Sequence, residues 1–249
     1  MTRQIPMLFS PAMVEALLAG RKTETRRITK LQSGTYFKKV QMPNPEFIGW
    51  QTNAAHGRGP SQVHIGPQVG DLIWVKEAHY AYGYWRTIPD ALTKAGKPKR
   101  EFVRDAGHCI TKGELAAKSA IKFRPDNIDV LPQNLNMRPG WFKRSSLFMP
   151  KADSRLTLPV TGFGIERLQD IDEASAAAEG VERLASPTRQ KYPFKIYGNR
   201  TIGDGCRSAK DSYKTLWDSI NGFLAWHANP WVDVTKFDVL HQNVREVAA

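Results

Sequence analysis

A short helix followed at once by a cationic extended segment is the feature that most constrains the fold of this chain. In Ser10–Gly20 a serine can cap the helix, a proline suits its first turn, and a glycine suits the residue just past its end. The next residues, RKTETRRIT (21–29), place β-branched residues between charged ones, which predicts an extended segment. Because side chains of such a segment alternate between two faces, one face should hold Lys22, Glu24 and Arg26 and the other Thr23, Thr25 and Arg27.

Further strands and helices are predicted downstream. Strands are expected at Asp71–Tyr80, at Ser154–Ile171 with a bend at Pro159, and at 230–240. Helices are expected at 172–184, where an aspartate can cap an alanine-rich run, and at the amphipathic run 212–221. These elements favour a single α+β domain, 1–249, built on a small and mostly antiparallel sheet or barrel.

Long irregular stretches separate the predicted elements. Turn-rich or polar sequence at about 31–68, 83–135 and 186–210 predicts insertions into the domain. The part at 83–125, with KAGKPKREFVR at its centre, is expected to be a basic surface excursion that includes one strand.

The net charge of +12 and the sequence pI of about 9.8 predict a polyanionic partner. RNA or another single-stranded nucleic acid fits better than a membrane surface, since no basic amphipathic helix with a large apolar face is evident. The sequence shows no membrane-length apolar run and no secretory signal, so a cytoplasmic location is expected.

Motifs for metals and cofactors are missing from the sequence. Cys109 and Cys206 lie far apart and neither belongs to a CxxC pair. There is no phosphate-binding glycine loop and no dinucleotide fingerprint. We therefore expect neither a metal nor a cofactor.

Four segments together resemble the ASCH domain family, in the form common in phages and prophages. They are LLAGRKTETRR (17–27), QVGDLIWVKEAHY (68–80), RLTLPVTGFGIERLQDI with ASAAAEGV (155–181), and LWDSINGFLAWHANPWV (216–232). The resemblance implies a PUA-like β-barrel with a cleft for RNA or a modified nucleoside. Some compact members are amidohydrolases of N4-acetylcytidine that act through a lysine, a threonine and a glutamate, and another member has ribonuclease activity. The matching positions are Lys22, Thr25 and Glu179, with Arg27 ending the signature.

The chemistry of this trio is reasonable without the family. A threonine hydroxyl needs a nearby base, and a lysine serves as one only when its pKa falls well below its usual value. Burial and the neighbouring Arg26 and Arg27 would lower it, and Glu179 could move the proton. In a fully extended segment, however, Lys22 and Thr25 would face opposite sides. The alternative is that the cations form a solvated edge and Thr25 is an ordinary strand residue.

Other candidate ligand residues lie outside the trio. Glu77 could enter the cleft, or pair with Lys76 or an arginine of the first motif, and Tyr80 could stack on a ligand or pack at a barrel rim. In Arg189–Arg200 aromatic and cationic residues alternate, as in single-strand binding surfaces, and the candidates are Lys191, Tyr192 and Tyr197. The alternative is that these aromatics fasten the loop to the domain. For Trp217, Trp226 and Trp231 a role in the core is predicted.

Three functions are compatible with these features. The first is a hydrolase of nucleic acid or of a modified nucleoside that uses the trio, with Arg26 and Arg27 holding oxygens. The second is a non-catalytic RNA- or DNA-binding module. The third is a phage-encoded inhibitor whose basic insertions contact a host protein.

Overall fold

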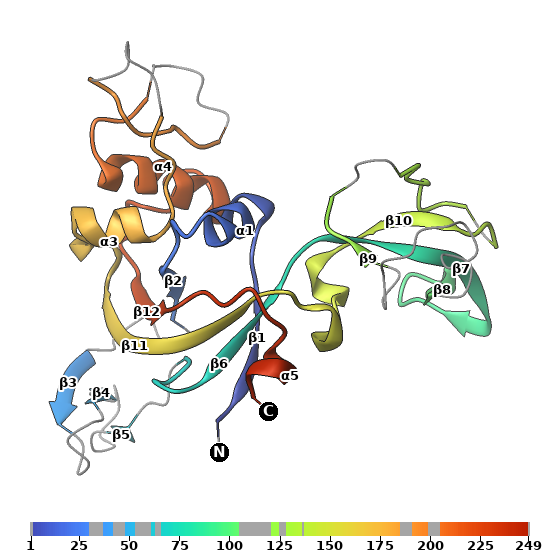
Figure 1. The fold of residues 1–249 in the computed structure, drawn as a ribbon, viewed down its shortest axis with the longest axis horizontal. Coiled ribbons are helices and arrows are strands. Elements are labelled where there is room, and N and C mark those ends of the chain that lie inside the picture. The colour runs from blue at the N-terminus through green and yellow to red at the C-terminus, as the bar shows by residue number, and fades with distance from the viewer. Residues whose placement is uncertain are drawn as a thin grey trace. The chain divides into compact units, whose positions relative to one another are not determined.

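The computed structural model describes residues 2–29, 37–41, 48–52, 61–62, 66–104, 121–124, 128–135, 137–184, 191–198 and 205–248. Over these ranges the chain has a mixed α+β fold, as predicted (Figure 1). It divides into two compact units. Unit 1 comprises Met1–Ile5, Ala12–Ile73 and Thr157–His241, and unit 2 comprises Pro6–Pro11, Trp74–Leu156 and Gln242–Ala249.

The largest sheet has five strands. In spatial order they are β1 (Gln4–Leu8), β6 (Leu72–Lys76), β11 (Thr157–Arg167), β12 (Trp231–Phe237) and β2 (Glu24–Ile28). β12 pairs antiparallel with both β11 and β2. β1 and β2 stand at opposite ends of this order, so the described strands form an open sheet and no closed barrel. A bulge in β11 follows Pro159, where the proline predicted a bend.

Three helices gather on one side of the β11–β12–β2 part of this sheet in Figure 1: α1 (Pro11–Leu18), α3 (Glu173–Ala178) and α4 (Ala209–Asn221). Their apolar faces supply much of the core of unit 1. α1 buries Leu17 completely, and α4 buries Tyr213 and Trp217 beside Trp226. The core prediction for Trp217 and Trp226 is therefore confirmed, whereas Trp231 is only half-buried.

The helix ends depend on two glycines. α1 stops before Gly20, whose φ of +67° is the left-handed conformation expected just past a helix end. α3 ends at Ala178 although a helix was predicted to continue to residue 184. The reason is Gly180, whose φ of +90° turns the chain away. A Cβ there would lie 2.8 Å from the Cβ atoms of both Ala16 and Lys22, so only glycine allows this close approach.

Unit 2 is built around a second antiparallel sheet. The 14-residue strand β7 (His79–Leu92) pairs with β10 (Gly140–Arg144), β8 (Pro98–Arg104) and the short β9 (Ile121–Lys122). Aromatic rings pack edge to face through it, with Trp85–Phe102 at 5.5 Å and Phe102–Phe142 at 5.6 Å between ring centres. A further short helix, α5 (Val244–Val247), follows near the C-terminus.

Some predicted boundaries were wrong. The strand expected at Asp71–Tyr80 is two strands, β6 and β7, because the Glu77 N–H donates to Met149 Sδ (3.2 Å) instead of continuing a ladder. The surface excursion at 83–125 holds β8, β9 and most of β7 instead of one strand. The stretch 31–68 contains a three-stranded sheet of β3 (Phe37–Gln41), β4 (Ile48–Thr52) and β5 (Ser61–Gln62).

None of the helices within the described ranges has the length and apolar character that crossing a membrane requires.

Candidate functional site

A buried contact between Lys22 and Glu179 is the centre of the candidate site in unit 1. The Lys22 ammonium donates to Glu179 Oε2 at 2.7 Å and to the Glu179 backbone carbonyl at 2.9 Å. Lys22 is 1% exposed and Glu179 is 3% exposed. Two residues 157 positions apart therefore form a nearly solvent-free ion pair.

Backbone pairing brings the two residues together. After Gly20 the chain runs antiparallel to the end of α3, where Lys22 and Glu179 form an isolated bridge. The Thr23 N–H donates to the Ala178 carbonyl at 2.8 Å. Arg21 adds a side-chain hydrogen bond from Nη1 to the Gly180 carbonyl at 2.9 Å. The pair is thus fixed by main-chain geometry on both sides.

Arg26 extends the pair into a network of charges. Its Nη1 lies 3.2 Å from Glu179 Oε1 and 3.1 Å from Glu24 Oε2, and its Nε lies 2.7 Å from Glu166 Oε1. Lys236 contacts the other oxygen of Glu24 at 3.0 Å. The network reaches solvent at its outer end, where the side chains of Glu166 and Lys236 are 31% and 56% exposed.

Burial changes the acid–base character of the inner groups. It lowers the pKa of Lys22, and the attraction of Glu179 only partly opposes this effect. Burial also acts against the charge of Arg26, but the carboxylates of Glu179 and Glu166 outweigh it and raise the pKa of Arg26. Burial and then Glu179 raise the pKa of Tyr213, whose hydroxyl lies 3.4 Å from Glu179 Oε1. The pKa of Lys22 is therefore lowered while that of Arg26 is raised, although both contact Glu179.

Thr25 and Arg27 project from the opposite face of the sheet. Glu24 and Arg26 both contact the network, so Thr25 between them points the other way, as the extended geometry implied. Its cross-strand neighbour is Thr235, and that of Arg27 is Asp233. Thr25 is buried and Arg27 is exposed. The structure thus brings Lys22 and Glu179 together. Among the described residues, Thr25 forms no hydrogen bond with either of them.

Asp233 lies half-buried on this second face. Its Oδ1 is buried without a hydrogen-bond partner among the described residues. Burial raises the pKa of its carboxyl to about 7. The folded state therefore binds a proton more readily than the unfolded chain between about pH 4 and 7. The contribution of the protonated Asp233 carboxyl to the free energy of unfolding is complete below about pH 4. It is lost as the pH rises to 7.

The Asp233→Asn variant should remove this pH dependence. We expect thermal and urea unfolding to show the variant about 1–2 kcal/mol more stable than the wild type at pH 8, and close to it at pH 4. This difference is smaller than the free energy that corresponds to the whole pKa shift, because the Asp233 carboxyl is partly exposed to solvent. Asp238→Asn, at an exposed position just after β12, is the control. Equal stability of Asp233→Asn and wild type at pH 8 would contradict this account.

Glu77 and Tyr80, predicted as ligand residues, lie in unit 2. Glu77 is 4% exposed, and its carboxylate receives two hydrogen bonds from Arg155, each of 2.9 Å. The ion-pair alternative therefore describes Glu77 better, although its partner is neither Lys76 nor an arginine of the first motif. Tyr80 is half-buried in β7, opposite Lys143 of β10. Neither residue belongs to the Lys22 network.

The segment around Lys191, Tyr192 and Tyr197 packs onto unit 1. The Tyr197 hydroxyl accepts a hydrogen bond from the Glu182 N–H at 2.8 Å, and Phe194 bridges both Arg183 and Cys206. These contacts favour the fastening role for Tyr197. Lys191 is exposed and lies over the Tyr192 ring at 5.7 Å, and Arg207 lies over the same ring at 5.5 Å, so the half-buried Tyr192 is already in contact with two cations.

Sequence reasoning missed four members of the network. Glu24 could have been found, because it alternates with Lys22 and Arg26. Lys236 is placed opposite Glu24 only by the strand register. Glu166 and Tyr213 come from β11 and α4, and no local sequence pattern connects them to Lys22.

The described residues contain no group of three or more metal-ligating side chains that could hold an ion. The chain matches no family model, no curated protein and no solved structure in the comparisons made. Functional assignment therefore depends on the geometry of the site and on the motifs of the sequence.

Proposed function

We propose that unit 1 is a PUA-like ASCH domain that binds nucleic acid or a modified nucleoside and hydrolyses an amide bond in it. The observation that carries the proposal is the direct contact of Lys22 and Glu179 in a nearly dry setting. Buried ion pairs add little net stability over apolar residues of similar size, and strongly perturbed titratable groups concentrate at functional sites. A function explains the retention of this pair better than stability does.

The pair can supply the proton transfers of amide hydrolysis. Lys22, with its lowered pKa, takes a proton from water while the water oxygen bonds to the acyl carbon. The C–N bond then breaks, and the proton returns through Glu179 to the leaving nitrogen. For an N4-acylated cytidine the products are a carboxylic acid and cytidine. Arg26, held by three carboxylates, orients Glu179 through its contact with Oε1.

The substrate class follows from charge as well as from the motif. Arg27, which ends the motif, is exposed on the face opposite Lys22 and can contact the phosphate oxygens of a nucleic acid. No acid–base step is assigned to Thr25, because its side chain leaves the sheet on the face away from Lys22.

The test is turnover of N4-acetylcytidine, free and within a short RNA, by the purified protein. Chromatography should show cytidine and acetate formed in equal amounts. Absence of both products from every acylated nucleoside and RNA would contradict the hydrolase.

A second candidate is a non-catalytic RNA- or DNA-binding module. It is favoured because Thr25 faces away from Lys22, and because Lys22 and Glu179 form their hydrogen bonds with each other. It predicts binding that weakens steeply with added salt and yields no product.

A further inference from the structure

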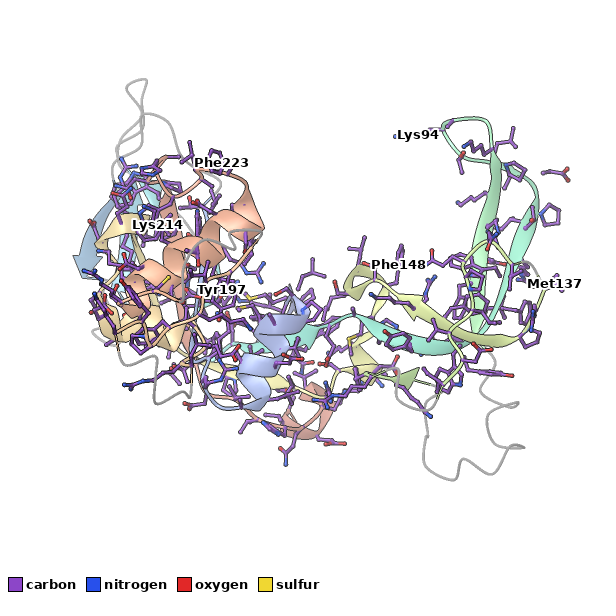
Figure 2. All side chains as sticks on the ribbon, turned by 90° about the horizontal axis from the view of Figure 1, so that it is seen from above. Lys94, Met137, Phe148, Tyr197, Lys214 and Phe223 are labelled. Atoms are coloured by element: carbon purple, nitrogen blue, oxygen red, sulfur yellow. The ribbon has the colours of Figure 1, made fainter. Side chains whose placement is uncertain are left out.

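Unit 2 carries most of the net positive charge of the chain. Residues 74–156 contain sixteen lysines and arginines and eight acids, so this stretch accounts for eight of the twelve net charges. The site proposed in unit 1 uses none of them. Figure 2 shows Lys94 at the tip of the β7–β8 hairpin and Phe148 at the surface near the end of β10.

Arg144, the last residue of β10, is held by aromatic rings and not by acids. Its guanidinium carbon lies 4.5 Å from the ring centre of Phe102, 4.8 Å from that of Trp85 and 5.0 Å from that of Phe148. The guanidinium makes no hydrogen bond or ion pair with any residue that the structure describes. Stacking fixes its plane and leaves its N–H donors without a partner in the described part of the chain.

The strand register builds this arrangement. Arg144 is paired with His79, and Trp85 with Phe102, so all four side chains lie on the same face of the sheet. Gly83 lies on that face between His79 and Trp85. A Cβ at Gly83 would be 2.9 Å from Phe102 Cζ, so the missing side chain leaves space for the ring beneath Arg144.

The surroundings of Arg144 favour an anion. Arg104 lies close by and its charge, after burial, contributes to lowering the pKa of Arg144. The nearby acid Asp153 is already paired with Arg104 at 2.8 Å. Burial lowers the pKa of His79, which therefore adds no positive charge at neutral pH. Among the described residues, an incoming phosphate would find donors without a partner and no unpaired carboxylate beside Arg144.

We propose that the surface of unit 2 at Arg144 and Phe148 binds single-stranded nucleic acid, with Arg144 donating to a backbone phosphate and Phe148 stacking on an adjacent base. Phe148 is 59% exposed, which leaves ring surface for a base beyond the contact with Arg144. A single strand is favoured because stacking on a side chain requires a base free of its duplex neighbours. The inference extends the nucleic-acid binding of the proposed function and does not depend on hydrolysis.

The test is fluorescence anisotropy with a labelled single-stranded RNA of about twelve nucleotides, over a range of salt concentrations. Arg144→Gln should weaken binding about tenfold and reduce the slope of log affinity against log salt by about 0.7, since one phosphate contact is lost. Phe148→Leu should weaken binding about tenfold with an unchanged slope. Arg86→Gln, which removes an exposed arginine paired with Glu101 at 2.6 Å, is the control and should change affinity less than twofold.

Affinities within twofold of wild type for both Arg144→Gln and Phe148→Leu would overturn the proposal. Should Arg144→Gln fail to fold by circular dichroism, Phe148→Leu alone decides, since its ring is at the surface. Lys22→Met separates the two proposals. Loss of RNA affinity in Lys22→Met, with none in Arg144→Gln, would contradict the unit 2 site. Absence of turnover with Arg144-dependent binding intact would contradict only the hydrolase.

Discussion

Replacing Glu179 with alanine should lower the free energy of unfolding by about 3–5 kcal/mol. The variant leaves the Lys22 ammonium buried without a carboxylate and removes one of the three carboxylates around Arg26. Removing one partner of a buried pair leaves an uncompensated charge, which costs far more than the pair contributes. Urea unfolding monitored by circular dichroism measures the change.

A matched surface variant shows whether burial is the cause. Glu182→Ala removes a carboxylate that is 43% exposed and pairs with Lys195 at 2.7 Å, so it should cost no more than about 1 kcal/mol. Similar losses in Glu179→Ala and Glu182→Ala would mean that the Lys22–Glu179 pair is not desolvated as described. The double variant Lys22→Met/Glu179→Leu should recover most of the lost stability, because both charges are gone while Arg26 keeps Glu24 and Glu166.

Lys22→Met should reduce kcat/KM for the acylated nucleoside by about 10²–10⁴-fold, the usual effect of losing a general base. Methionine keeps the unbranched shape and removes the amine. In the wild type, the rate should rise with pH as Lys22 loses its proton, and burial moves this rise below the pH at which an ordinary lysine titrates. Steady-state kinetics across pH should show the rise in the wild type and not in the variant.

Lys236→Met is the control for this measurement. Lys236 belongs to the same network through Glu24, but its side chain is 56% exposed and it does not contact Glu179. Turnover by Lys236→Met should stay within a few-fold of wild type. An equal loss in the two lysine variants would show that net positive charge, and not the position of Lys22, supports the reaction.

The sequence contained the local part of the site. The alternation of charges after Gly20 predicted that Lys22, Glu24 and Arg26 share a face, because the two-residue period of a strand is a local property. The end of the first helix before Gly20 was also predictable, because a glycine just past a helix end is a local signal as well. The partner Glu179 came only from the family resemblance, since local periodicity says nothing about contacts between residues 157 positions apart.

Other parts of the molecule left weaker signals in the sequence. Glu166 and Tyr213 join the network through strand register and helix packing, which arise only in the folded chain. In β7 the alternation of Tyr80, Tyr82 and Tyr84 is a strand pattern, but the basic and glycine-containing sequence that follows resembles a surface loop. The early end of α3 depends on Gly180 meeting Ala16, a contact that helix propensity does not include.

Turnover by the double variant Lys22→Met/Glu179→Leu tests the central claim most directly, because this protein should stay folded without its buried charge pair. We expect a cooperative unfolding transition close to that of the wild type and no release of acetate from N4-acetylcytidine. A folded double variant that releases acetate at the wild-type rate would contradict the catalytic role of the pair.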